Sequence, residues 1–82
     1  MGGTAFITGA GRGIGRAVAR RLAAEGYAVG INYARSREEA EALAEEIRSQ
    51  GGKALAVQGD VADRAAITAA IRQVEEAFGP IT

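Results

Sequence analysis

Residues 8–15 read Thr8-Gly9-Ala10-Gly11-Arg12-Gly13-Ile14-Gly15, and this glycine-rich stretch decides the fold. An apolar run, Thr4-Ala5-Phe6-Ile7, precedes it, and an amphipathic run that begins at Arg16 follows it. A strand that ends in a glycine turn and leads into a helix is an arrangement that binds phosphate. The turn leaves backbone N–H groups accessible, and the helix N-terminus adds a partial positive charge. The stretch therefore predicts a nucleotide site near the start of the chain.

Length and composition exclude several classes of protein. The chain has 82 residues, so we expect one small domain over residues 1–82. It contains no cysteine and no histidine, which argues against disulfides and against thiolate or imidazole metal sites. Ten basic and ten acidic residues cancel, which disfavours a nucleic-acid or membrane-surface binder. Met1-Gly2-Gly3 lacks the charged and hydrophobic regions of a signal peptide, so we expect a soluble, cytoplasmic protein.

Three short apolar runs with strand character alternate with three helical patterns. We place strands at Ala5–Thr8, Ala28–Tyr33 and Ala54–Gln58, and their continuous apolarity is typical of parallel strands covered on both faces. Each crossover holds a whole helix, so the strands are parallel and the connections right-handed. The expected fold is α/β: the N-terminal half of a three-layer, Rossmann-type domain, βαβαβα, with strand order 3-2-1 and truncated before strand four.

The ends of the helical segments are marked by caps and glycines. Apolar residues recur at helical spacing from Ile14, after Ser36 and after Asp63. Ser36 with Glu39 three residues later resembles a capping box, and Asp63 is a candidate N-cap. Glycines that can stop the three helices stand at Gly26, Gly51-Gly52 and Gly79.

The spacing of the glycines differs from that of two common nucleotide-binding motifs. Gly9, Gly13 and Gly15 give G-x-x-x-G-x-G, not the G-x-G-x-x-G fingerprint of many dinucleotide sites. The stretch also lacks the Gly-Lys-Ser/Thr ending of a P-loop, which disfavours nucleotide hydrolysis. Glycine still permits a positive φ and lets a pyrophosphate approach the backbone with no Cβ in the way. The plainer alternative is a strand–helix turn that merely needs glycine.

These residues resemble the cofactor motif of the short-chain dehydrogenase/reductase family, and most closely that of its bacterial 3-oxoacyl-[acyl-carrier-protein] reductases. The resemblance is carried by Thr8-Gly9-x-x-x-Gly13-Ile14-Gly15 and continues through residues 32–36, 59–61 and 78–81. It covers essentially the whole chain but only the N-terminal part of a typical member. It implies an oxidoreductase that transfers hydride between a nicotinamide dinucleotide and a carbonyl or alcohol.

The residues after the second strand favour NADP(H) over NAD(H) as the cofactor. An NAD site usually has Asp or Glu there to bind the ribose hydroxyls. Here residues 32–35 read Asn-Tyr-Ala-Arg, and no carboxylate follows until Glu38. Arg12, Arg35 and the Ser36 hydroxyl are candidates to bind the 2′-phosphate through charge-assisted hydrogen bonds. The alternative for each arginine is a solvated surface side chain.

Asp60 and Val61 follow the third strand at the carboxyl edge of the sheet, where ligands bind in open α/β folds. By resemblance, Asp60 would accept a hydrogen bond from the adenine amino group and Val61 would contact the ring. The alternative is that Asp60 caps the turn into the third helix, and both roles can hold together. The expected cofactor-binding residues are Gly9, Gly11, Arg12, Gly13, Ile14, Gly15, Tyr33, Arg35, Ser36, Asp60 and Val61.

The catalytic residues that the resemblance implies are absent from this sequence. Family members use a Tyr-x-x-x-Lys pair and a serine, whereas Tyr33 is followed four residues later by Arg37. We therefore assign no catalytic residue and no metal ligand. We expect these residues to bind a dinucleotide without catalysing a reaction by themselves.

The first strand presents an apolar edge in this arrangement. Such an edge templates association, so we expect a homo-oligomer, most simply a two-fold dimer through that edge or an exchange of the third helix. Two other interpretations remain open at this point. One is a non-enzymatic module that senses a nucleotide, and the other is a structural module in which the glycine turn survives only as part of the fold.

Overall fold

The computed structural model of the chain describes residues 2–9 and 13–82. Its elements follow one another as β1 (Thr4–Thr8), α1 (Gly13–Ala24), β2 (Ala28–Tyr33), α2 (Arg37–Ser49), β3 (Lys53–Gln58) and α3 (Arg64–Phe78). All three predicted strands and all three predicted helices are present. β1 and β3 each begin one residue earlier than the sequence pattern indicated.

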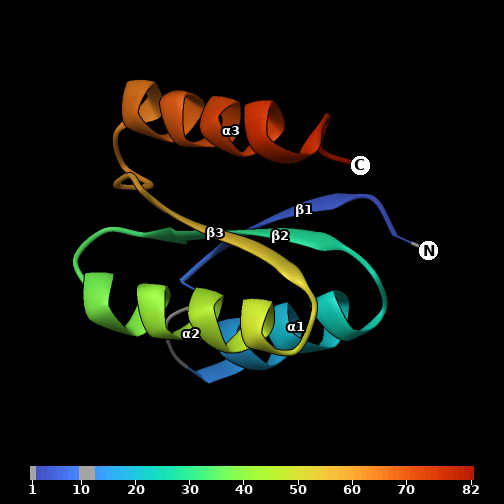
Figure 1. The fold of residues 1–82 in the computed structure, drawn as a ribbon. Helices are drawn as coiled ribbons and strands as arrows, with labels where there is room; N and C mark the ends of the chain where they lie inside the picture. The colour runs from blue at the N-terminus through green and yellow to red at the C-terminus, as the bar shows by residue number, and fades with distance from the viewer. Residues whose placement is uncertain (1, 10–12) are drawn as a thin grey trace.

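The three strands form one parallel sheet with β2 in the middle. Its order, β1-β2-β3, is the predicted 3-2-1 arrangement read from the other edge. Helices α1 and α2 cover one face and α3 covers the other, so the half domain has three layers (Figure 1). All strands run in one direction, so their carboxyl ends, and the N-termini of the helices that follow, lie at one edge of the sheet. The Rossmann-type α/β prediction is confirmed.

β2 organises the core because all six of its residues are buried. Alternate residues point to opposite faces of a strand. Val29 and Ile31 therefore pack against α1 and α2, together with Leu43 of α2. Fully burying an aliphatic side chain of this size stabilises a fold by roughly 1.5–3 kcal/mol. This face carries the larger of the two hydrophobic clusters.

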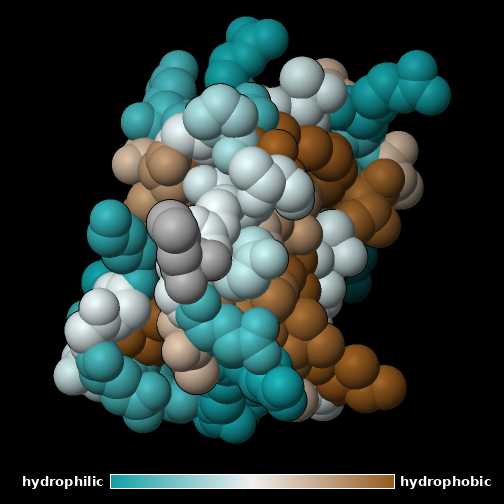
Figure 2. Space-filling model, turned by 90° about the vertical axis from the view of Figure 1, so that its right-hand side faces the viewer, coloured by the Kyte–Doolittle hydropathy of each residue, from teal (hydrophilic) through white to brown (hydrophobic). Residues whose placement is uncertain are grey.

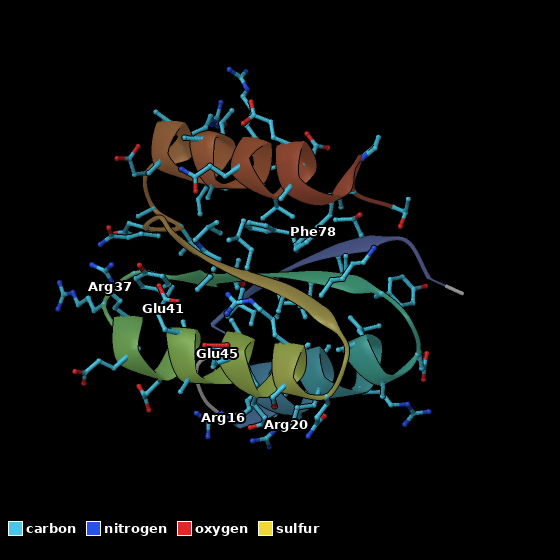
Figure 3. The ribbon with its side chains drawn as sticks, in the orientation of Figure 1. Arg16, Arg20, Arg37, Glu41, Glu45 and Phe78 are labelled. Atoms are coloured by element: carbon cyan, nitrogen blue, oxygen red, sulfur yellow. The ribbon has the colours of Figure 1, made fainter. Side chains whose placement is uncertain are left out.

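On the other face, α3 packs directly against the backbone of β2 at Gly30. A Cβ at this glycine would lie 2.4 Å from Cγ2 of Val74, which is itself fully buried. Val57 and Ala70 complete the small cluster on this side, and Phe78 points from the end of α3 toward the sheet (Figure 3). Gly30 is therefore required by close packing and not by backbone conformation.

The helix ends agree with the sequence pattern except at one side chain. Asp63 is the N-cap of α3, and its Oδ1 accepts a hydrogen bond from the Ala66 N–H at 3.2 Å. Gly26 and Gly51, which follow α1 and α2, have φ values of 96° and 89°, a region that favours glycine. Ser36 does occupy the N-cap position of α2, but its side chain makes no cap hydrogen bond, so the capping-box prediction is wrong for this residue.

The free edge of β1 is partly covered by the end of the chain. Ile81 forms a parallel bridge with Thr4, and the Thr82 N–H donates to the Thr4 carbonyl oxygen at 2.9 Å. The expected open edge is therefore occupied at Thr4, because the chain turns back toward β1 after α3. Figure 2 shows hydrophobic residues running from the upper centre to the lower right of one side of the molecule, with more hydrophilic residues to their left.

Candidate functional site

The sheet brings three predicted segments to one edge. Thr8 pairs with Asn32, and Tyr33 pairs with Gln58, so the three strands end side by side. The glycine turn after β1, the turn at residues 34–36 after β2 and the loop at residues 59–63 after β3 all leave the sheet here. This edge is where open α/β sheets bind ligands.

Two glycines of the turn have a conformation and a setting that suit a ligand. Gly9 has a φ of 65° and Gly13 a φ of 56°, the left-handed region that side chains other than glycine rarely adopt. A Cβ built at either position would meet no atom of the described protein within 4 Å. The glycines are therefore required by backbone conformation, and the space beside them is open. The predicted residues Gly11 and Arg12 lie outside the described residues.

The N-terminus of α1 is better suited to an anion than those of α2 and α3, because the N-cap of α3 is the carboxylate of Asp63. The first turn of α1 carries no acidic residue, whereas the first turn of α2 carries Glu38 and Glu39. The partial positive charge of α1 is therefore not offset by carboxylates of its own first turn. Ile14 is 84 % exposed next to Gly13, and Gly15 is half-buried in the same turn of helix.

The segment after β2 divides the predicted residues into two groups. The Tyr33 side chain is only 8 % exposed and belongs to the core beneath α1 and α2. The Tyr33 carbonyl accepts the Gly59 N–H at 2.9 Å, so its side chain and its carbonyl are both engaged within the fold. Arg35 is exposed and Ser36 half-buried on the turn that follows, and Arg37 extends outward from the start of α2 (Figure 3).

At the end of β3, Asp60 has the capping role that the sequence left open. Its Oδ1 accepts the Ala62 N–H at 2.9 Å, and its carbonyl accepts the Asp63 N–H at 2.8 Å. These two bonds shape the loop into α3. Asp60 as a whole remains exposed, and Val61 is 67 % exposed beside it. The loop thus presents a carboxylate and an apolar side chain to solvent at the same edge.

Sequence reasoning missed one residue that the structure places at this edge. Asn32 is 1 % exposed, and its Nδ2 donates to the carbonyls of Val57 at 3.3 Å and Gly59 at 3.1 Å. The available signal was a single amide in the otherwise apolar run of β2, one residue before the strand ends at Tyr33. An unpaired amide is too costly to bury, so its position in a buried strand predicts partners nearby.

Charged side chains also pair on the outer side of α1 and α2, away from the sheet (Figure 3). Arg20 of α1 donates through Nε and Nη2 to the two carboxylate oxygens of Glu46 on α2, at 2.7 and 2.9 Å. The hydrogen bonds from Arg20 lower the pKa of the Glu46 carboxyl, and the same bonds raise the pKa of the Arg20 guanidinium. The Nε atom of neighbouring Arg16 is buried and has no hydrogen-bond partner in the described part of the chain.

Other kinds of site find no support in the parts of the chain that the structure describes. Within residues 2–9 and 13–82, His, Cys, Asp and Glu form no group that could hold a metal ion. No helix in the same ranges is long and apolar enough to cross a membrane. A hollow of about 520 Å³ lies at the opposite edge, lined by Gly2, Gly26, Gly51 and Lys53 among others. A dinucleotide at the carboxyl edge would thus lie across an open surface and not in this cavity.

Comparison with family models and curated proteins identifies the family to which the chain is similar. The short chain dehydrogenase model matches residues 3–82. The chain is 49 % identical over 78 residues to the 3-oxoacyl-[acyl-carrier-protein] reductase of Staphylococcus aureus, covering 95 % of this chain and 32 % of that protein. It is also 49 % identical over 78 residues to versicolorin reductase of Emericella nidulans, with 95 % and 30 % covered. The chain thus spans about a third of the length of these relatives.

Solved structures agree with this comparison. A dehydrogenase/reductase from Sinorhizobium meliloti superimposes with a TM-score of 0.93 at 48 % identity, over 96 % of this chain and 31 % of that one. A blue fluorescent protein from a metagenomic library, described in complex with NADPH, superimposes with a TM-score of 0.92 at 41 % identity, over 96 % and 33 %. The similarity therefore extends over 96 % of the chain, and the chain belongs to the short-chain dehydrogenase family.

Proposed function

We propose that the chain is the NADP(H)-binding segment of a short-chain dehydrogenase/reductase and that it is not catalytic by itself. The observation that carries the proposal is the pair Gly9 and Gly13, which have positive φ and open space where a side chain would stand. A pyrophosphate fits such a cradle because it can approach the backbone closely, at the start of a helix that carries no acid in its first turn.

The adenosine side of the cofactor is assigned to the neighbouring loops. Asp60 would accept a hydrogen bond from the adenine amino group through its exposed carboxylate, and Val61 would pack against the ring. Arg35 and Ser36, together with Arg12 outside the described residues, would bind the 2′-phosphate. Support for NADP(H) over NAD(H) comes from the turn after β2, where an exposed arginine stands and no carboxylate precedes Glu38.

The buried position of Tyr33 limits the part that it can play in cofactor binding. Its side chain belongs to the core and its carbonyl is taken by Gly59. We therefore propose that Tyr33 supports the turn that carries Arg35 and does not itself contact the cofactor. Gly11, Ile14 and Gly15 stay in the proposed pyrophosphate site.

The reaction proposed for a longer protein that contains this chain is inferred from the names of the relatives. Two relatives are named as reductases, and one structural neighbour is described in complex with NADPH. When bound, the nicotinamide would supply the hydride for reduction of a carbonyl or accept it from an alcohol. The 82 residues hold no Tyr-x-x-x-Lys pair, so the described residues are assigned cofactor binding alone.

A parallel titration with NADP⁺ and NAD⁺, followed by backbone amide shifts, tests this function. We expect shifts at Gly9, Gly13, Arg35 and Asp60, and tighter binding of NADP⁺ with a dissociation constant on the order of millimolar. Equal binding of the two dinucleotides would contradict the NADP(H) assignment. No response to either dinucleotide at concentrations well above this dissociation constant would contradict the binding function. The fold would then have a structural role.

Self-association through the β1 edge is a second part of the proposal. In a parallel ladder the residues of an edge strand alternate in the direction of their backbone groups. The Thr4 groups face outward to Thr82, so those of Phe6 and Thr8 face outward as well. Exposed Ile14 and Val18 add apolar surface on α1. Light scattering over a dilution series should reveal a dimer, and a monomer at all concentrations would refute it.

A lysine on that edge gives a sharper test. Thr8→Lys places a charge where two β1 edges would meet, and edge lysines are a common means of blocking strand association. We expect this variant to be monomeric where the wild type is dimeric.

A cytoplasmic location is likewise a proposal, which cell fractionation of the native protein tests.

A further inference from the structure

Asn32 is one of two buried polar residues in the described part of the chain, and the other is Thr4 at the opposite end of the sheet. In the β2–β3 register Asn32 lies beside Val57. Its side-chain amide donates to the Val57 carbonyl at 3.3 Å and to the Gly59 carbonyl at 3.1 Å. Both hydrogens of the amide are therefore used on one neighbouring segment, at the point where β3 ends.

Gly59 is the residue that these contacts hold in place. Its N–H donates to the Tyr33 carbonyl at 2.9 Å, so the ladder continues one residue beyond β3. A Cβ on this buried glycine would lie 3.3 Å from Nδ2 of Asn32 and 3.1 Å from the carbonyl oxygen of Ala66. Gly59 is thus confined between the side chain of β2 and the first turn of α3.

The path of the chain beyond Gly59 depends on this anchor. Asp60 accepts the Ala62 N–H through Oδ1 and the Asp63 N–H through its carbonyl. Asp63 in turn caps α3 through the Ala66 N–H. A continuous set of hydrogen bonds therefore runs from the buried amide of β2 to the N-terminus of α3, and the exposed residues Asp60 and Val61 lie on it.

We propose that Asn32 is a positioning residue for the adenine end of the site. It fixes the Gly59 carbonyl and thereby the direction in which Asp60 and Val61 leave the sheet, without touching the ligand itself. This inference rests on the proposed function for its ligand but not for its effect on the loop. An aliphatic residue of similar size could fill the space but could not donate to either carbonyl, and an aspartate would set oxygens against oxygens.

The experiment compares Asn32→Leu with a matched control, Thr4→Val. The control also removes a buried polar group on the α3 face, where the Thr4 hydroxyl donates to the Phe78 carbonyl at 3.3 Å. Amide hydrogen exchange in the ligand-free protein should rise at Gly59, Ala62 and Asp63 in Asn32→Leu and stay unchanged there in Thr4→Val. Unchanged exchange at these amides in Asn32→Leu would overturn the inference.

Two probes separate the adenine end from the glycine turn. Adenosine 2′,5′-bisphosphate reports on the adenine end, and inorganic pyrophosphate reports on the turn alone. We expect Asn32→Leu to bind the adenosine compound about tenfold more weakly, the loss of roughly one well-made hydrogen bond at the ligand, and to bind pyrophosphate as the wild type does. Equal weakening of both ligands, or the same loss in Thr4→Val, would show a general effect on the fold and overturn the positioning role.

The two proposals fail in different ways. If the wild type binds neither probe, the proposed function is wrong and the adenine role of Asn32 falls with it. The exchange measurement still decides in that case whether Asn32 sets the conformation of residues 59–63. If the wild type binds both probes and Asn32→Leu discriminates between them, both proposals are supported.

Discussion

Thr4 and Thr82, 78 positions apart, are joined by hydrogen bonds in both directions. The Thr4 N–H donates to Oγ1 of Thr82 at 3.2 Å, and the Thr82 N–H donates to the Thr4 carbonyl at 2.9 Å. Thr4 is 3 % exposed, so the end of the chain shields the outer edge of β1 at its first residue. The contact extends the sheet beyond its three strands at this one point.

Removing the Thr82 hydroxyl should weaken the contact that covers this edge. In Thr82→Ala the Thr4 N–H loses its acceptor, and we expect a loss of about 1 kcal/mol in the free energy of unfolding. Hydrogen exchange at the Thr4 amide measures the effect directly. Thr82→Ser keeps the hydroxyl and serves as the control. Equal exchange in Thr82→Ala and wild type would mean that water replaces the contact without cost.

Gly30 and Val74 should show strong coupling in stability. Gly30→Ala places a Cβ 2.4 Å from Val74 Cγ2, and the resulting overpacking should cost about 1–3 kcal/mol. Val74→Ala frees that space, so the double variant should recover part of the loss, with a coupling of about 0.5–3 kcal/mol. Urea unfolding of the four proteins closes the cycle. Strictly additive losses would show that α3 moves away from β2 instead of clashing with it.

One glycine of the proposed pyrophosphate site and one remote glycine allow a matched test of ligand contact. Gly13→Ala and Gly51→Ala both place alanine at a positive φ with no protein atom near the new Cβ. Each should lower the free energy of unfolding by roughly 1–2 kcal/mol. Only Gly13→Ala should weaken NADP⁺ binding, by about tenfold or more, because its Cβ occupies the space of the pyrophosphate. Similar binding by both variants would contradict the placement of the ligand.

Arg35 should decide between the two dinucleotides. If its guanidinium binds the 2′-phosphate, Arg35→Ala weakens NADP⁺ binding about tenfold and leaves NAD⁺ binding unchanged. Arg72→Ala removes another exposed charge, on α3, and should change neither affinity. Titration of the three proteins with both dinucleotides provides the comparison. A parallel loss for NAD⁺ would assign Arg35 to the shared part of the cofactor.

The Arg20–Glu46 pair should make stability depend on pH in acid. The pKa of Glu46 is lowered in the folded protein, so the pair stabilises the fold above the carboxyl's ordinary range and ceases to do so as the pH falls through the folded value. Glu46→Gln should therefore be less stable than wild type near neutrality and equal to it in stronger acid. The effect should be small because both side chains are solvent-exposed. Glu76→Gln on α3 controls for the loss of any surface carboxylate.

Local signals predicted most of the fold. The Asp63 cap and the stops at Gly26 and Gly51 were recognisable because each depends on residues within one or two turns of chain. The same reasoning failed for Ser36, whose hydroxyl makes no cap bond although the helix begins after it. Residue type at an N-cap predicts where a helix starts better than it predicts the rotamer of the capping side chain.

The sequence predicted where the candidate residues lie along the fold better than it predicted which of their side chains are exposed. Gly9 and Gly13 were identified because glycine is the residue type that readily adopts a positive φ. Tyr33 was grouped with them because it lies in residues 32–36, which carry part of the family resemblance, yet its side chain faces the core. The face to which a strand residue points depends on the register of the whole sheet, which a buried run with little alternation does not reveal.

By itself the sequence determined the order of strands and helices, their approximate ends, the parallel sheet and the edge at which the glycine turn lies. These follow from periodicity, caps and glycines, which act over a few residues. Only the tertiary structure decided that Asn32 anchors Gly59, that Val74 rests on Gly30 and that Thr82 closes on Thr4. Such contacts join residues distant in the chain, and they form only where the packed helices and the strand register bring donor and acceptor within reach of one another.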